Sequence, residues 1–312
     1  MISITIPVLN EQENIVPSYN ELTTVMQQLA RDYEIIFIND GSSDNTANIL
    51  DALAEKDGKL KVIHLKRSYR QTAAMMAGFD FSKGDIIIPM DGDLQNNPQD
   101  IPKLIECLEQ GYDLVSGWRK NRKDNKFSRV LISRIANYLI SLISGVKLHD
   151  FGCTLKAYRR EIIQDVKLYG EMHRFIPIYA KWEGAKIAEI IVSHRERVHG
   201  DSKYGLSRIV KVILDLIVVQ FLFNYSKKPI YLFGSFGLLL IMLALAAISY
   251  ALFQKFIFGL SLILTPLPVL ASMCFITGIT SILMGLLAEL VTRTYHETQN
   301  KPVYAVAKKI NF

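Results

Sequence analysis

Two aspartates stand one residue apart at the end of an apolar run, in the segment GDIIIPMDGDLQNNPQD (84–100). Neighbouring carboxylates repel each other and raise each other's pKa unless a positive charge lies between them. Asp91, Asp93 and Gln95 are spaced two apart, so in an extended segment their side chains would share one face. Their oxygens suit a hard divalent cation, which would offset the repulsion. The alternative is a solvated turn without a ligand, and the surrounding elements decide between the two.

Short apolar, β-branched runs alternate with helical stretches through the first part of the chain. The runs read ISITIPV, YEIIFIND, KVIHLK, DIIIPMD and YDLVSGW, and the helical patterns include residues 12–30 and 45–56. This order is typical of an α/β domain with a mainly parallel sheet covered by helices on both faces. The carboxylate pair follows the fourth run, so it would stand at the carboxyl end of a buried strand, where such sheets bind ligands.

Polar clusters follow two further strands of this predicted sheet. Asn10 and Glu11 come after the first strand, and NDGSSD (39–44) comes after the second. Asp40 could hydrogen bond a base or a ribose, whereas Gly41 permits a tight turn and the residues after it can cap the next helix. Taken alone, this segment is more simply a turn with a helix cap. Together with a Mg²⁺ or Mn²⁺ site at the same edge, which would complete its shell with substrate phosphates, it favours a nucleotide.

The last third of the chain contains two long stretches without a charged side chain, 229–254 and 256–288. Each exceeds the roughly 20 apolar residues that cross a bilayer as a helix. We therefore expect two transmembrane helices within residues 226–292, joined by a short connection at about 253–265, rather than two buried core helices. The composition agrees, because 50% of the 312 residues are hydrophobic and the mean hydropathy is +0.18.

Basic residues at the ends of these stretches predict the orientation in the membrane. They are Lys227 and Lys228 before the first helix, Lys255 in the connection, and Arg293, Lys301, Lys308 and Lys309 after the second. Because basic residues collect on the cytoplasmic side, we expect a protein of the inner (plasma) membrane with residues 1–225 and a tail of residues 293–312 in the cytoplasm. The N-terminus lacks the pattern of a cleaved signal peptide. The three cysteines, far apart in sequence, suit free thiols in a reducing compartment.

A basic segment follows the fifth predicted strand. Between Arg119 and Arg134 there are seven basic residues and one acidic residue, and the pattern over about 128–144 predicts an amphipathic helix in the headgroup layer. A second such helix is expected at about 206–221. The basic residues suit a lipid-phosphate acceptor, although a polybasic patch would bind any anionic lipid. The candidates for the acceptor phosphate in this segment are Arg119, Arg122, Arg129 and Arg134.

Four motifs in order carry a family resemblance: SITIPVLNEQENI, IIFINDGSSDNT, MDGDLQNNP and DFGCTLKAYRRE. They resemble the family 2 glycosyltransferases of the GT-A fold, a Rossmann-like α/β fold, and specifically the polyprenyl-phosphate glycosyltransferases. That group includes dolichol-phosphate mannose synthases and bactoprenol (undecaprenyl-phosphate) glucosyltransferases. The resemblance covers about residues 3–204, and the two trailing helices suit the bacterial branch. The Q-x-x-R-W motif of processive synthases is absent, which favours one sugar per turnover.

The resemblance implies roles for individual residues. Pro7, Asn10, Glu11, Asp40 and Asp91 would bind the nucleotide sugar, Asp91, Asp93 and Gln95 would bind Mg²⁺ or Mn²⁺, and Asp93 and Asp150 would be the catalytic residues. In RERVHGDSKYG, the residues Arg197, Ser202 and Lys203 match the acceptor-loop pattern. A phosphate monoester is largely ionised at neutral pH, so a general base is not compulsory, and Asp150 could either orient a substrate or accept the last proton.

The expected reaction is an inverting transfer of one sugar to undecaprenyl phosphate. The resemblance favours UDP-glucose as the donor, and GDP-mannose, UDP-GlcNAc and UDP-arabinose derivatives remain open. Two other classes compete: a transporter, which would usually need polar groups inside its spans, and a non-catalytic membrane scaffold that only binds nucleotide. No nucleic-acid partner is expected.

Small residues in the two apolar stretches predict self-association. They are Gly234, Ser235 and Gly237 in the first stretch and Gly278, Ser281 and Gly285 in the second. Small side chains let membrane helices approach closely, so we expect a homo-oligomer, a tetramer or a dimer.

Overall fold

The computed structural model describes residues 1–120, 137, 140–142, 144–164, 166, 172–196, 230–298 and 303–312. The chain divides into two compact units, one of residues 1–217 with 302–312 and the other of residues 218–301. Each unit is considered by itself.

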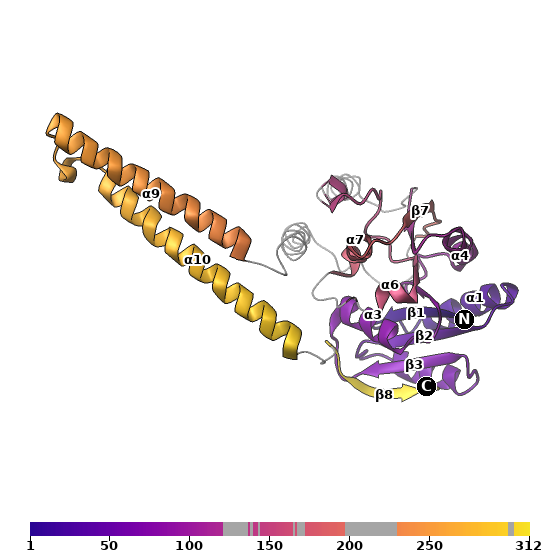
Figure 1. Ribbon diagram of the computed structural model, residues 1–312. Coiled ribbons are helices and arrows are strands. Elements are labelled where there is room, and N and C mark those ends of the chain that lie inside the picture. Colours follow the sequence, from indigo (N-terminus) through magenta and orange to yellow (C-terminus); the bar gives the residue numbers. More distant parts are fainter. Residues whose placement is uncertain are drawn as a thin grey trace. The chain divides into compact units, whose positions relative to one another are not determined.

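An eight-stranded sheet forms the centre of the first unit (Figure 1). Its strands are β1 (Ile2–Val8), β2 (Tyr33–Asn39), β3 (Leu60–Leu65), β4 (Ile86–Pro89), β5 (Leu114–Trp118), β6 (Lys156–Arg159), β7 (Ile187–Ile191) and β8 (Val306–Ile310), in the order β7-β5-β6-β4-β1-β2-β3-β8. β4, β1, β2 and β3 are parallel, β7 is parallel to β5, and β6 and β8 are antiparallel to their neighbours. This mainly parallel α/β sheet confirms the predicted fold class.

Helices connect the strands of this unit. They are α1 (Ile15–Gln28), α2 (Thr46–Ala54), α3 (Arg70–Phe81), α4 (Ile101–Glu109), α6 (Arg160–Ile163) and α7 (Ile176–Trp182), with 3-10 turns η1 (Pro98–Asp100) and η2 (Met172–Phe175). The branched side chains of β1 and β2 are almost wholly buried, with Ile4, Ile6 and Ile35 at 0% exposure. Parallel strands covered on both faces have such continuous apolar runs, which is why these strands could be read from sequence.

The C-terminal residues belong to the sheet. β8 pairs antiparallel with β3, and the side-chain amide of Asn311 donates to the carbonyls of Ala54 and Leu60 at 2.7 and 2.8 Å. Residues 293–312 are therefore not a separate tail, as the sequence suggested, because their last part completes an edge of the domain.

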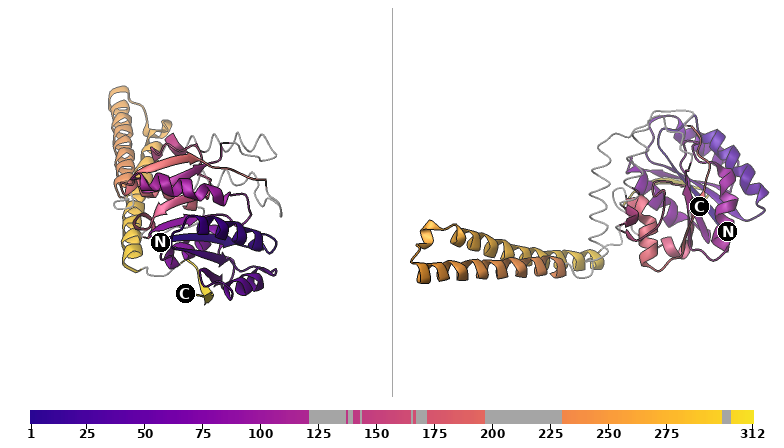
Figure 2. Two further views of the ribbon diagram at one scale, coloured as in Figure 1. Left: turned by 90° about the vertical axis from the view of Figure 1, so that its right-hand side faces the viewer. Right: turned by 90° about the horizontal axis from the view of Figure 1, so that it is seen from above.

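The second unit is a hairpin of two long helices, α9 (Ile230–Phe258) and α10 (Leu267–Thr298), whose axes lie side by side (Figure 2). Residues 230–258 and 267–288 are long and apolar enough to cross a membrane, with mean hydropathies of 2.4 and 2.0. Two candidate membrane-spanning helices thus lie where the sequence predicted them. α9 runs about six residues further than expected, so the connection is 259–266, with a 3-10 turn η3 (Leu262–Leu264).

Small residues line the contact between α9 and α10. Ala244 is 4% exposed and Ala251 1%, and Gly237 precedes them at the same seven-residue spacing. A Cβ added at Gly237 would lie 2.6 Å from the carbonyl oxygen of Gly278, so the two backbones are in direct contact. Ser281 donates its hydroxyl to the carbonyl of Phe233 at 2.9 Å.

Several of the small residues from which self-association was predicted make contacts within the hairpin instead. Gly237, Gly278 and Ser281 pack within one hairpin, and a Cβ at Gly285 would meet Phe233 and Ile230 of the same hairpin. The homo-oligomer therefore remains a prediction.

Candidate active site

The loops that follow β1 and β2 are joined by hydrogen bonds. Asn10 adopts a positive φ of 55°. Its backbone N–H donates to Ser42 Oγ at 2.9 Å, and its side-chain oxygen accepts from the N–H of Ser43 at 2.8 Å. The N–H of Glu11 donates to Thr46 Oγ1 at 3.1 Å. The structure thus brings the first two predicted polar clusters together at one edge of the sheet, and Pro7 stands close by on β1, opposite Ile38 of β2.

Asp40 is buried and organises the segment before α3. Its carboxylate accepts from Ser68 Oγ at 2.8 Å and from the backbone N–H groups of Tyr69 and Arg70 at 2.7 and 3.0 Å. A direct contact between Asp40 and a nucleotide stays a prediction. Gly41 has a φ of 70°, and a Cβ there would lie 2.6 Å from the backbone of Arg67, so only glycine fits this turn.

The carboxylate pair follows β4, in a segment that bends. Leu94 adopts a φ of 62°, so residues 91–95 are not extended. The expectation that an extended backbone places the side chains of Asp91, Asp93 and Gln95 on one face is therefore wrong. Asp93 is only 8% exposed, and one of its oxygens accepts from the N–H of Gln95 at 3.2 Å. Asp91 accepts from the side-chain amide of Gln71, in the first turn of α3, at 2.9 Å.

Burial, followed by the charge of Asp93, raises the pKa of Asp91 to about 6. A pair of carboxylates that repel each other in a partly buried site is suited to a divalent cation, so the residues present fit a metal. Among the residues that the structure describes, no group of three or more His, Cys, Asp and Glu side chains could hold a metal ion. A cation at Asp91 and Asp93, with Gln95, would therefore leave positions for oxygens of a substrate.

Two cations, Arg119 with a side chain 11% exposed and the buried Lys156, lie close to this pair. The Nε of Arg119 donates to one carboxylate oxygen of Asp150 at 2.7 Å, and its Nη2 donates to the other at 3.0 Å. Lys156 on β6 is 2% exposed, and its ammonium donates to the carbonyls of Phe151 and Cys153. Both cations stabilise the charged form of Asp91, whereas burial lowers the pKa of Lys156 itself.

Sequence reasoning missed Gln71 and Lys156, and it treated Arg119 and Asp150 as independent. Lys156 lies inside the fourth motif, and its place in that motif is the one signal that could have identified it. No pattern in the sequence pairs Arg119 with Asp150, because they are 31 residues apart.

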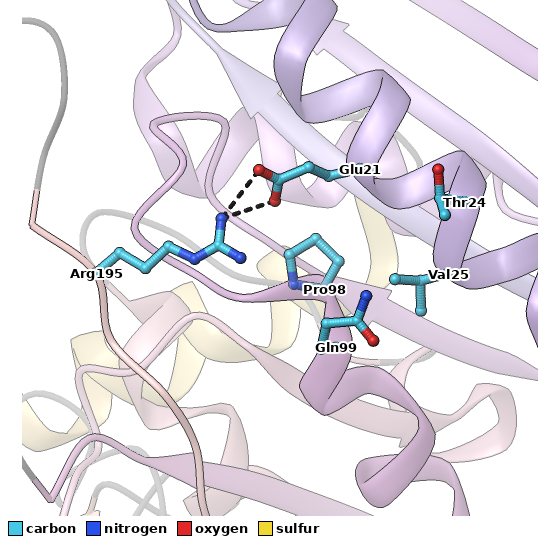
Figure 3. Close-up of a pocket in the computed structure, with 6 residues that line it drawn as sticks. All are labelled: Glu21, Thr24, Val25, Pro98, Gln99 and Arg195. Atoms are coloured by element: carbon cyan, nitrogen blue, oxygen red, sulfur yellow. Dashed lines mark hydrogen bonds and ion pairs between the residues drawn. The ribbon is translucent and has the colours of Figure 1, made fainter.

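Residues 91–97 are here called the metal loop, because they include the predicted metal ligands. An ion pair and hydrogen bonds of Arg195, here called the clasp, join this loop to α1 (Figure 3). The Nη1 of Arg195 donates to both carboxylate oxygens of Glu21, at 3.0 and 2.7 Å, and its Nη2 donates to Asn97 Oδ1 at 2.9 Å. Its backbone N–H donates to the carbonyl of Gln95 at 2.9 Å. Arg195 and Glu21 also line a pocket of about 180 Å³ with Thr24, Val25, Pro98 and Gln99. The chain that leads to residue 197 is therefore fixed beside the metal loop.

The remaining acceptor candidates, Arg122, Arg129, Arg134, Arg197, Ser202 and Lys203, lie outside the described residues. The predicted helix at 206–221 does so too, as does most of the one at 128–144.

The sheet and its polar edge define a GT-A domain. Glucosyl-3-phosphoglycerate synthase from Mycobacterium tuberculosis, solved in complex with Mn²⁺ and UDP-glucose, is similar with a TM-score of 0.54 and 18% identity, over 70% of this chain and 78% of that one. Its complex with Mn²⁺, UDP and phosphoglyceric acid gives a TM-score of 0.53. At this identity the likeness shows the fold alone.

Comparison of sequences identifies the family. The model of glycosyl transferase family 2 matches residues 3–167. The chain is 43% identical to dodecaprenyl-phosphate galacturonate synthase of Rhizobium johnstonii, over 98% of this chain and 91% of the relative. It is 38% identical to undecaprenyl-phosphate 4-deoxy-4-formamido-L-arabinose transferase of Pseudomonas fluorescens, over 98% and 89%. The chain therefore belongs to glycosyl transferase family 2, which confirms the resemblance seen in its motifs.

Proposed function

We propose that this chain transfers a single sugar from a nucleotide-activated donor to a polyprenyl phosphate at the inner membrane. The observation that carries the proposal is the 43% identity to a polyprenyl-phosphate sugar transferase along 98% of the chain, apolar helices included. A carboxylate pair at the carboxyl edge of the sheet supports it, because a divalent cation held there would bind the phosphate groups of a nucleotide sugar. A scaffold that only binds nucleotide would have no need of that pair.

The relatives favour a nucleotide-activated galacturonate or arabinose derivative over UDP-glucose as the donor. Neither of the two relatives is named for glucose, whereas their sugars share a feature: galacturonate and L-arabinose have the same ring configuration at C2, C3 and C4. Their substituent at C4 is axial, and in glucose it is equatorial. A UDP-arabinose derivative was among the donors left open by the sequence, and we now place it, with UDP-galacturonate, before UDP-glucose.

The residues of the site have distinct roles in this proposal. Asp91, Asp93 and Gln95 would hold Mg²⁺ or Mn²⁺, which when bound offsets the charge of the departing diphosphate. Both carboxylate oxygens of Asp150 accept hydrogen bonds from Arg119, which favours an orienting role for Asp150 over proton removal. The acceptor phosphate is already ionised at neutral pH and attacks without a base. A single in-line displacement inverts the anomeric carbon.

The two helices would hold the domain at the cytoplasmic face of the membrane. The pairing of β8 with β3, which returns the chain to the first unit after α10, supports an arrangement with both ends of the hairpin on one side of the bilayer. The basic residues that flank the helices support the cytoplasmic side, where nucleotide sugars are made.

Turnover by the full-length protein in vesicles containing undecaprenyl phosphate tests the proposal. UDP-galacturonate, UDP-4-deoxy-4-formamido-L-arabinose and UDP-glucose are compared at equal concentration with Mg²⁺ or Mn²⁺. We expect a lipid-linked product with inverted anomeric configuration from one of the first two donors. Faster product from UDP-glucose would overturn the choice of donor, retention would overturn the mechanism, and UDP binding without any turnover would favour the scaffold.

A further inference from the structure

Glu189 is an acidic residue on an edge strand, and yet its side chain is only 11% exposed. Its neighbours on β7, Ala188 and Ile190, pack against the main hydrophobic core. Side chains alternate along a strand, so Glu189 faces the opposite side of the sheet. A carboxylate that is largely removed from water needs hydrogen-bond donors to offset its desolvation.

The donors all come from one turn, that of His149 and Asp150. The Oε1 of Glu189 accepts from the backbone N–H of His149 at 2.8 Å and from that of Asp150 at 3.1 Å. Its Oε2 lies 2.6 Å from His149 Nδ1, which donates. Hydrogen bonds to an ionised acceptor are short and strong, and three of them fix the orientation of the peptide that joins His149 to Asp150.

The same turn is held from β5. The Asp150 carboxylate is bound through both oxygens to Arg119, which directly follows β5, and it also accepts from the N–H of Gly152 at 3.0 Å. The ring of His149 stacks on Trp118, the last residue of β5, with centroids 4.2 Å apart and an angle of 15°. Trp118 is in register with Ile191 of β7. The turn of His149 and Asp150 is therefore bound by residues of two adjacent parallel strands, by Glu189 of β7 and by Trp118 and Arg119 at the end of β5.

We infer that Glu189 is a positioning residue that sets the place of the Asp150–Arg119 pair relative to the sheet edge. The inference rests on the proposed function for its kinetic consequences. Without the Glu189 carboxylate, two consecutive N–H groups lose this acceptor and the peptide between them loses its link to β7. Because a displacement of about 1 Å at a reacting centre costs up to roughly a hundredfold in rate, kcat is the quantity that should respond.

Two conservative variants separate position from charge. Glu189→Gln keeps an oxygen within reach of both N–H groups but removes the charge, whereas Glu189→Asp keeps the charge and withdraws it by one methylene. If position matters, Glu189→Gln retains most of the activity and Glu189→Asp loses roughly tenfold in kcat, with an unchanged KM for the donor. The exposed Glu183 at the end of α7 provides the control, and Glu183→Asp should leave both parameters unchanged. Equal kinetics for the two Glu189 variants, or a more active Glu189→Asp, would overturn the inference.

Combination with Asp150→Asn asks whether Glu189 acts through Asp150. In that background Glu189→Asp should cause no further loss, because the group that it positions has already been altered. A loss of the same factor in both backgrounds would contradict the inference.

A readout that needs no turnover makes the result independent of the proposed reaction. The chain has two tryptophans, Trp118 and Trp182, so Trp182→Phe leaves Trp118 as the only indole. The stacked imidazole quenches indole emission, so opening the stack should raise the emission of Trp118. We expect this rise in Glu189→Asp and not in Glu189→Gln or Glu183→Asp. The same emission in all variants would show that Glu189 does not hold the turn, even if no donor were ever turned over.

Discussion

The carboxyl edge of the sheet and the contact between α9 and α10 both bring groups unusually close, but for different reasons. At the sheet edge Asp91 and Asp93 repel each other, and burial with that repulsion raises the pKa of Asp91 to about 6. At the hairpin the backbones of Gly237 and Gly278 touch, and neither carries a side chain or a charge. The first arrangement costs stability and is suited to a ligand, whereas the second contributes to stability by itself.

This difference between charge repulsion and close backbone contact predicts which property of a side chain matters in each region. At the sheet edge the charge and the oxygen atoms should be decisive, so an isosteric change that removes charge is severe. At the hairpin size should be decisive, so one added methyl group is severe and a change of chemistry at equal size is mild. Each prediction below tests one side of this comparison.

The largest effect is expected for Asp93→Asn, which keeps the shape of a buried side chain and removes its charge. Loss of a charged metal ligand should cost several kcal/mol of transition-state stabilisation, so turnover falls about a thousandfold. Asp91→Asn should be somewhat less severe. Circular dichroism should show a folded protein for both, and Asp32→Asn, at an exposed position, is the control. Full activity of Asp93→Asn in EDTA would remove Asp93 from the metal site.

The second prediction concerns size at the hairpin. A Cβ at Gly278 would lie 2.8 Å from the carbonyl oxygen of Gly237 and 2.9 Å from the side chain of Ile241, so Gly278→Ala should overpack the contact. We expect it to lower the free energy of unfolding in mild detergent by about 1–3 kcal/mol. Gly234→Ala is the matched control, because the nearest atoms to its Cβ belong to Ile230 of its own helix, at 3.6 Å. Equal thermal unfolding of the two variants would contradict the close packing.

The two regions also differ in how far the sequence predicts them. β1 to β5 and both apolar helices were predicted because a buried strand and a membrane span each have a continuous local pattern. β6, β7 and β8 were missed, since they are short and two of them are edge strands with polar residues such as Glu189 and Lys308. Small residues predicted packing against other copies of the chain, whereas the structure has several of them in the contact between α9 and α10, because a pattern along one helix does not say which helix is its partner.

The sequence predicted where in the fold the carboxylate pair lies but not most of its contacts, and the role of these residues stays a prediction. The motifs placed Asp91 and Asp93 at the carboxyl edge, and the structure agrees. The extended geometry was wrong because Leu94 adopts a positive φ, which propensity does not indicate for leucine. Glu189 and Arg195 were not considered, since their partners lie 40 and 174 residues away in sequence and meet them only in the folded chain.

The third prediction concerns the pH dependence of the repulsion at the sheet edge. The pKa of Asp91 is raised from 3.8 to about 6 in the folded protein, so between these values the folded state holds a proton that the unfolded state has lost. Without metal, stability should therefore fall as pH rises through this window, by about 3 kcal/mol, and stay low above it. Mg²⁺ or Mn²⁺ should stabilise the protein more at pH 7.5 than at pH 5.

Thermal unfolding with and without metal at these two pH values measures this effect. Asp91→Asn should be more stable than the unsubstituted protein at pH 7.5 in EDTA and should lose the stabilisation by metal. A metal-free protein whose stability rises between pH 4 and pH 6 through Asp91 would contradict the assigned direction of the pKa.

The smallest effect is expected at the clasp of Arg195 and Glu21, which has the charge of the site but lies on its periphery. Their side chains are 41% and 42% exposed, so the ion pair should contribute less than about 1 kcal/mol to the free energy of unfolding. The pair of Arg31 and Glu109 is a close match, with exposures of 44% and 47%. Only Arg195 also contacts the metal loop, through Asn97. Arg195→Ala and Arg31→Ala should therefore unfold at similar temperatures, whereas only Arg195→Ala should raise the Mn²⁺ concentration that gives half-maximal activity, by about threefold to fivefold, with the donor KM unchanged at saturating metal. The same Mn²⁺ requirement in both variants would show that the clasp is an ordinary surface ion pair. Metal binding would then depend on the charges of the residues at the sheet edge and not on the charge of Arg195.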